Sequence, residues 1–135
     1  MKILGIDPGL TSCGYCIIEH NDLSTDLIFF GHINTKPKAG IAVRLSQLYR
    51  HFADSVIPIY KPNVVAIEDQ FVGKNHDVTM KIVMAKTACL LAGANNKIPV
   101  IQFKPCVVKY AITRDGKASK DKIKKKIERL FGTIE

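Results

Sequence analysis

The chain has 135 residues, enough for one domain with a single sizeable core. Its hydrophobic content of 47% and charged content of 24% are those of a globular protein and exclude a disordered chain. No apolar run approaches the ~20 residues that cross a bilayer, and the start "MKILGID" lacks the pattern of a signal peptide. The sequence therefore predicts a cytoplasmic protein without a membrane partner.

The net charge of +8 is unevenly distributed along the chain. Residues 1–96 contain 9 basic and 8 acidic side chains, whereas residues 97–135 contain 11 basic and 4 acidic ones. A basic segment attached to a nearly neutral body is typical of a protein that binds a polyanion. A solvated helix face would have the same composition, so charge alone leaves both interpretations open.

The first half of the chain is predicted to form three strands and a helix. Apolar patterning predicts strands over 2–6, 14–20 and 26–33, and their short connections make them an antiparallel meander. Apolar residues then recur at helical spacing and predict an amphipathic helix that ends near Pro58. These residues are Ile41, Leu45, Leu48, Phe52 and Val56.

The second half alternates strands with helices. The continuous apolar run "VVAIE" at 64–68 is typical of a buried parallel strand, and "IPVIQF" at 98–103 forms the next strand. A helix from about 78 to 94 separates them, and a short helix follows over 105–112. Ser119 caps a last helix with one apolar stripe, formed by Ile123, Ile127, Leu130 and Phe131. This order predicts an α/β protein, a mixed sheet with helices on its faces.

The helix from about Val78 to Ala94 has apolar side chains around its circumference, more than one contact with a sheet requires. They are Met80, Ile82, Val83, Met84, Leu90 and Leu91. Its small residues, which we expect to let a second helix approach, are Ala85, Ala88, Ala92 and Gly93. We therefore predict that this helix takes part in a two-fold dimer contact.

Four cysteines stand at positions 13, 16, 89 and 106. "CGYC" has the C-x-x-C spacing of zinc and redox sites. No second pair or suitably spaced histidine follows it, and within a strand Cys13 and Cys16 point to opposite faces. We therefore expect small buried or half-buried thiols.

Asp7 and Glu68 each end a predicted strand. Because the first three strands form a meander, the strand that ends at Glu68 joins the sheet beside the first strand or the third. Pairing in parallel with the first strand would bring both carboxylates to a topological switch point, on strands ~4.8 Å apart. Such a pair can share a divalent ion or hold two ions, and hard oxygen ligands favour Mg²⁺ or Mn²⁺. Alternatively, Asp7 only opens a turn and Glu68 only ends a strand.

The stretches "GIDPGLTSCGYCII" and "VAIEDQFVGKNHD" together resemble the RuvC family of Holliday junction resolvases. The resemblance continues through "MKIVMAKTACLLAGA" and "VIQFKPCVVKYAITRDGKASKDKI", nearly to the end of the sequence. It implies a single RNase H-like domain of the retroviral integrase superfamily, with a five-stranded sheet in the order 3-2-1-4-5. It also implies a homodimer that binds a four-way DNA junction and cuts two strands symmetrically. The cofactor that it implies is Mg²⁺, replaceable by Mn²⁺, with two ions per site. It also suggests branch-migration motor proteins as further partners.

The resemblance assigns roles position by position. Asp7 and Glu68 match two of the family's four metal-binding acids, and Lys109 and Lys120 match lysines beside the active site. Phe71 matches an aromatic residue that stacks on a base near the crossover. The further residues expected to contact DNA are Lys74, Asn75 and Lys117.

The sequence lacks two of the acidic positions that the family pattern requires. The family's last helix carries an Asp or a His, followed three residues later by an Asp, and these two complete the metal site. The sequence ends at "LFGTIE", where the connection to that helix would begin, and no Asp-x-x-Asp pair lies on an apolar helix. We therefore expect either part of a longer protein or a relative that binds junctions without cutting them.

Two other functional classes fit part of the sequence. "GIDPGLTSCGY" also resembles the first phosphate-binding hairpin of the actin, hexokinase and Hsp70 group, although the chain lacks their length and their second phosphate loop. ATP would stabilise such a protein by mass action, whereas a resolvase responds to Mg²⁺ and branched DNA. A non-catalytic DNA-binding module on the same fold would share the basic C-terminal third.

Overall fold

The computed structural model describes residues 1–69 and 73–133. Its strands form one mixed sheet in the order β3-β2-β1-β4-β5, as the resemblance implies. The antiparallel meander consists of β1 (Lys2–Asp7), β2 (Ser12–His20) and β3 (Thr25–Asn34). Parallel pairing then adds β4 (Val64–Glu68) beside β1 and β5 (Val100–Phe103) beside β4.

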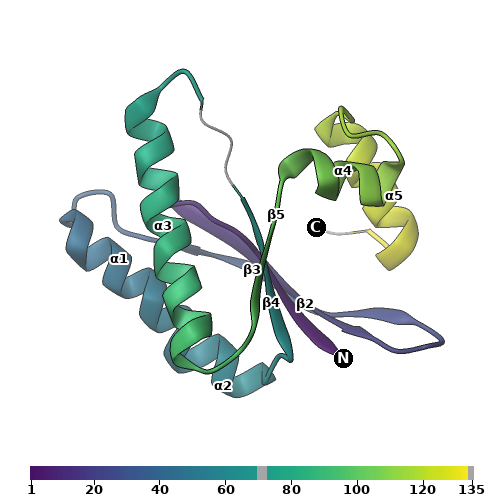
Figure 1. Ribbon diagram of the computed structural model, residues 1–135, viewed down its shortest axis with the longest axis horizontal. Coiled ribbons are helices and arrows are strands. Elements are labelled where there is room, and N and C mark those ends of the chain that lie inside the picture. Colours follow the sequence, from purple (N-terminus) through teal and green to yellow (C-terminus); the bar gives the residue numbers. More distant parts are fainter. Residues whose placement is uncertain (70–72, 134–135) are drawn as a thin grey trace.

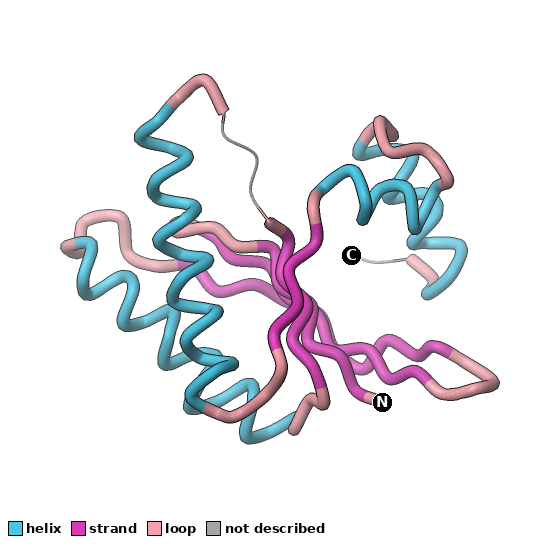
Figure 2. The backbone as a smooth tube through the Cα atoms, viewed as in Figure 1, coloured by secondary structure: helices cyan, strands magenta, loops and turns pink. Residues whose placement is uncertain are grey.

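Helices lie on both sides of this sheet (Figures 1 and 2). One face is covered by α1 (Ile41–Arg50), a π-helical segment η1 (His51–Val56), α2 (Ile57–Tyr60) and α3 (His76–Asn95). On the other side, α4 (Pro105–Thr113) and α5 (Lys120–Phe131) form a separate pair (Figure 1). No helix in the described part of the chain is both long and apolar enough to span a membrane.

The hydrophobic core lies between the sheet and α1–α3. Strand residues such as Leu4, Val65 and Ile67 are fully buried there. The small residues of α3 face the same core, since a Cβ atom added to Gly93 would lie 2.6 Å from Cγ2 of Val100. A second helix does approach α3, but it is α1 of the same chain, so the small residues do not serve a partner's helix as predicted.

The helix predicted to end near Pro58 continues to Tyr60. Pro58 lies in the first turn of α2, directly after the π-helical segment, so the chain continues as a helix through the proline. The helix ends at Lys61, which adopts a left-handed conformation with φ 49°. Its N–H donates to the carbonyl of Ile57 at 2.8 Å.

The two nearest cysteines occupy opposite faces of β2, as the sequence predicts. Cys13 is fully buried in the core with Cys89. Cys16 lies on the other face, where a Cβ atom added to Gly5 would approach its Sγ to 3.2 Å. All four cysteines are free thiols.

Candidate active site

Asp7 and Glu68 end two adjacent parallel strands. β1 and β4 pair in register up to Ile6 and Ile67, which places the next residues, Asp7 and Glu68, side by side at the carboxyl edge of the sheet. The parallel pairing on which the sequence argument depends is therefore confirmed. The edge is also a topological switch point, because the chain adds β2 and β3 on one side of β1 and then adds β4 and β5 on the other side.

The two carboxylates interact electrostatically with each other and with two lysines. Burial raises the pKa of Asp7, and the positive charge of Lys120 partly opposes this shift. Burial also raises the pKa of Glu68, the charge of Asp7 raises it further, and Lys109 opposes both effects. Two acids from the sheet and two lysines from α4 and α5 therefore lie within electrostatic reach of one another.

Asp7 is followed by a tight turn that α1 holds in place. Gly9 is required in this turn, because a Cβ atom there would clash with the carbonyl oxygen of Ser12. The buried hydroxyl of Thr35 donates to the carbonyl of Leu10 at 2.5 Å. Arg44 donates in turn to this hydroxyl at 2.8 Å, so the turn after Asp7 is connected to α1.

An ion pair fixes the chain on the other side of the site. Asp69 directly follows Glu68, and its carboxylate accepts from Lys86 Nζ of α3 at 2.6 Å. Its N–H donates to the carbonyl of Phe103 at 2.7 Å, which extends the alignment of β4 with β5. This pair could not be predicted from the sequence, since nothing in the local pattern places Lys86 next to Asp69.

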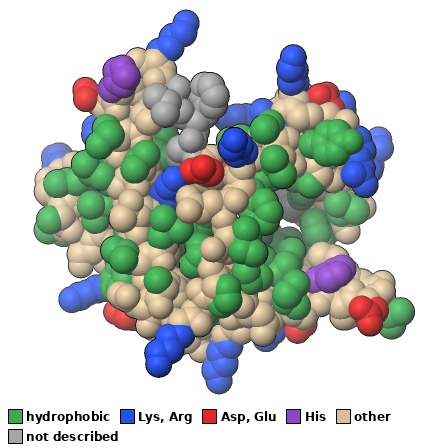
Figure 3. Space-filling view, viewed as in Figure 1, with side chains coloured by type: hydrophobic (Ala, Val, Ile, Leu, Met, Phe, Trp, Pro, Cys, Tyr) green, Lys and Arg blue, Asp and Glu red, His purple; other side chains and the backbone are tan. Residues whose placement is uncertain are grey.

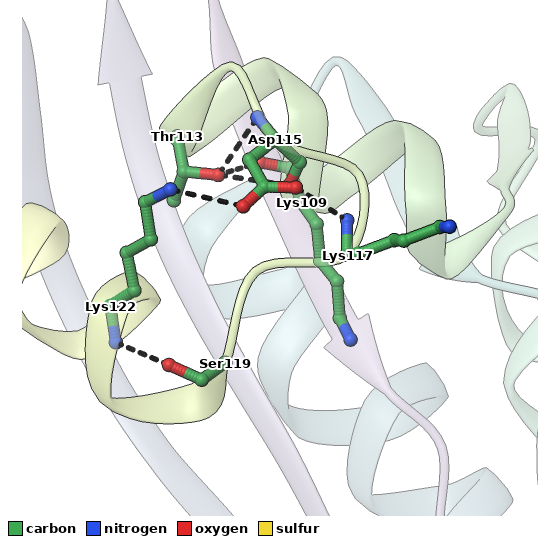
Figure 4. A network of polar contacts seen from close by, with 6 residues as sticks. All are labelled: Lys109, Thr113, Asp115, Lys117, Ser119 and Lys122. Carbon is green, nitrogen blue, oxygen red and sulfur yellow. Dashed lines mark hydrogen bonds and ion pairs between the residues drawn. The ribbon is translucent and has the colours of Figure 1, made fainter.

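The connection between α4 and α5 is organised by Asp115 (Figure 4). Its carboxylate accepts from the N–H of Lys117 at 2.9 Å and from Nζ of Lys122 at 3.0 Å, which lowers its pKa. Thr113 donates through its hydroxyl to the carbonyl of Lys109 at 2.8 Å and accepts from the N–H of Asp115 at 3.2 Å. These contacts fix α5 relative to the turn of α4 that carries Lys109.

The acids line an open pocket of about 320 Å³ on the sheet face next to α4. Small residues form part of its lining, among them Gly5, Gly14 and Ala66. Phe103 and Val108 contribute apolar surface. The carboxylates are therefore accessible from this face of the sheet.

The donor set fits part of a magnesium site. Both side chains offer the hard oxygen ligands that Mg²⁺ prefers, and a bound cation would relieve the repulsion between them. Within residues 1–69 and 73–133, no group of three or more His, Cys, Asp or Glu side chains could hold a metal ion. Water and phosphate oxygens, or further carboxylates, would have to complete the ~6 ligands of such an ion.

Of the other residues predicted to contact DNA, the structure describes Lys74, Asn75 and Lys117, and these lie outside this cluster. Phe71 lies outside the described residues. Lys74 is exposed just before α3. Asn75 caps α3, where its side-chain oxygen accepts from the N–H of Val78 at 3.2 Å, so it has a structural role of its own. Lys117 is exposed in the α4–α5 connection.

Comparisons with known proteins give one consistent result. The family model of the crossover junction endodeoxyribonuclease RuvC matches residues 3–134. RuvC of Dehalococcoides mccartyi is 36% identical over 135 residues, which are 100% of this chain and 81% of the relative. RuvC of Desulforamulus reducens is 37% identical, with 100% of this chain and 82% of the relative covered. The structure of T. thermophilus RuvC in complex with Holliday junction substrate matches with a TM-score of 0.90 at 26% identity, covering 100% of this chain and 82% of that one.

Proposed function

The chain belongs to the RuvC family of crossover junction endodeoxyribonucleases, and from this premise we propose that it resolves four-way DNA junctions by Mg²⁺-dependent hydrolysis of two phosphodiester bonds. The observation that carries the proposal is the pairing of Asp7 with Glu68 at the carboxyl edge of the sheet, opposite Lys109 and Lys120. Its DNA substrate would place the protein in the cytoplasm.

Asp7 and Glu68 would hold the metal, as a pair of ions or as one shared ion. A divalent cation in this position supplies an activated water and stabilises the charge on the leaving oxygen. Strand ends are suitable supports, because β1 and β4 are buried and hydrogen-bonded on both sides. Lys109 and Lys120 would orient the scissile phosphate and neutralise charge that develops on it.

The remaining predicted residues would bind the junction outside the cleavage site. Phe71 would stack on a base at the branch point, a type of contact worth ~1–3 kcal/mol. Lys74, Asn75 and Lys117 would contact the phosphate backbone and set the orientation of the duplex. Branch-migration motor proteins would act on the same junction.

A homodimer would match a substrate with two equivalent bonds to cut. One side of α3 supports this proposal, because Met80 and Leu91 lie only about 20° apart around the helix and are each at least half exposed. Between α1 and α3 lies an apolar groove of about 340 Å³, lined among others by Leu45, Tyr49 and Met84. A second copy of this surface would cover these side chains.

Competition binding tests the junction preference. The protein should retain a labelled four-way junction in the presence of excess linear duplex of the same sequence, because only the junction offers a branch point and several arms together. Asp7→Asn should keep this preference, since the proposed role of Asp7 is to bind metal rather than DNA. Equal affinity for junction and duplex would contradict the proposal. A non-catalytic DNA-binding module, the alternative on this fold, would bind junctions but never cut them.

A further inference from the structure

A second basic surface lies between α4 and α5, apart from the site at Asp7 and Glu68. It is a groove of about 670 Å³, here called the α4–α5 groove. Its cationic lining consists of Arg114, Lys122, Lys125, Lys126 and Arg129. Lys and Arg side chains gather over the α4–α5 pair at the right of Figure 3. Ile112 and Leu130 contribute apolar surface to the groove.

The charges of α5 are segregated around the helix. At 100° per residue, the four cations of α5 in the groove lie about 140–240° away from Lys120. Lys120 is the residue whose charge acts on Asp7. The acids Asp121 and Glu128 lie only about 80–100° from Lys120, outside the cationic stripe. The cations of the α4–α5 groove therefore lie on one side of α5, and Lys120, which interacts with Asp7, lies on another side.

Most of the positive charge in the groove is uncompensated. Lys122 pairs with Asp115 at 3.0 Å. In the described part of the chain, no ion pair involves Lys125, Lys126 or Arg129. Arg114 stands with its guanidinium carbon 5.9 Å from the centre of the Tyr110 ring, a cation–π contact that holds it at the groove without cancelling its charge.

We propose that the α4–α5 groove binds the sugar–phosphate backbone of a duplex arm of the junction, away from the phosphate that is cut. This inference rests on the proposed function, because it takes the junction as the substrate. The stripe from Lys122 to Arg129 extends about 10 Å along the helix axis. Successive phosphates of one strand are spaced ~3.4 Å along a duplex axis, so the stripe can contact two or three of them.

The chemistry of the groove favours a backbone over bases. Lysine is a point charge that attracts phosphate without the planar geometry needed to read a base edge. Contacts of this kind fix the register of the duplex and are independent of sequence. An arm anchored here would fix the orientation of the bound junction relative to the protein.

A pair of charge-matched double variants tests the proposal. Lys125→Gln with Lys126→Gln removes two groove charges from exposed positions and keeps helix propensity nearly constant. Lys61→Gln with Lys97→Gln removes the same charge just before β4 and β5, at the edge of the sheet opposite the catalytic acids. Junction affinity is measured for both proteins and the unmodified chain over a series of KCl concentrations, with long arms and with trimmed arms. Circular dichroism checks that all three proteins are folded.

The groove variant should show a weaker salt dependence on the long-armed junction. Each lost phosphate contact reduces the slope of log K against log salt by ~0.9, so the expected reduction is about 2, whereas the control variant keeps the original slope. On a junction with arms too short to reach the groove, the difference between the variants should disappear.

Equal slopes for the two variants would overturn the proposal and leave the groove to another partner, such as an acidic protein segment. A reduction in slope that persists in full on the junction with trimmed arms would also overturn the proposal, because the groove would then bind the crossover. The proposed function fails by a different result, namely an unmodified chain that does not prefer junction to linear duplex.

Discussion

Asp7→Asn should stabilise the metal-free protein at neutral pH. The pKa values of Asp7 and Glu68 are both raised in the folded chain, so the folded state holds its protons to higher pH than the unfolded state. The stability that this gives is fully present below the unfolded values of about 4 and is lost as the pH rises through the raised folded values. Once the pH exceeds these raised values, both groups are ionised, and their repulsion opposes folding.

The size of the effect follows from the strand geometry. Two charges on neighbouring strands, ~5 Å apart, repel by roughly 3 kcal/mol at an effective dielectric constant of 20 and by under 1 kcal/mol in bulk water. Because Asp7 and Glu68 are only partly buried and both border the open pocket, water screens their repulsion and the lower part of this range applies. We expect a gain of ~1 kcal/mol, which corresponds to about 3–5 °C in Tm for a domain of this size.

Thermal unfolding at pH 7 with a chelator measures this gain. Asp22→Asn is the matched control, because it removes one negative charge from an exposed turn at the far end of the β2–β3 hairpin. Added Mg²⁺ should raise the Tm of the unmodified protein and leave that of Asp7→Asn nearly unchanged. The reasoning is refuted if Asp7→Asn unfolds at the same temperature as the unmodified protein, or at a lower one.

Three further predictions concern metal binding, assembly and packing. In a Mn²⁺ titration the 135-residue chain should bind weakly, because two carboxylates supply few of the ~6 ligands needed. Joining its C-terminus to a relative's helix with an Asp-x-x-Asp pair should tighten binding, and equal affinity would contradict the assignment of the ligands. In gel filtration, Leu91→Asp should convert a dimer to a monomer, whereas Ile59→Asp, the same kind of change at an exposed apolar residue of α2, should not. A monomeric unmodified protein would contradict the dimer. Gly93→Ala should lower the free energy of unfolding, measured in urea, by ~1–3 kcal/mol, because the added Cβ atom would overlap Val100. Gly40→Ala, with open space around it, should be nearly neutral. Equal stability of the two variants would contradict the packing.

The meander could be predicted from local patterns and connectivity, whereas the place of β4 beside β1, which brings the two acids together, followed from the resemblance to the family. Short links force the first three strands into a meander, and a long crossover then adds a parallel strand. Asp7 and Glu68 are each the last residue of a strand, so parallel pairing is enough to bring them together. No knowledge of side-chain packing is needed for either step.

Contacts between elements that are distant in the sequence could not be predicted. Periodicity showed small residues on α3, but Gly93 packs on Val100 of the same chain rather than on a partner. The pair of Lys86 with Asp69 joins residues from separate elements, and only the folded arrangement places them together. In the same way, the sequence did not show that Arg114 and the cations of α5 line one groove, because that depends on how α5 packs beside α4.

Cleavage of an end-labelled four-way junction in Mg²⁺ tests the central claim most directly, that Asp7 and Glu68 form the catalytic metal site of a junction resolvase. All three proteins in this assay carry the added helix with the Asp-x-x-Asp pair. One has no substitution and is called unmodified here, one carries Asp7→Asn, and one carries Asp22→Asn. The unmodified and Asp22→Asn proteins should produce paired nicks at symmetry-related positions, and Asp7→Asn should produce none while it still binds the junction. Nicking by Asp7→Asn at the unmodified rate, or no nicking by the unmodified protein, would contradict the claim.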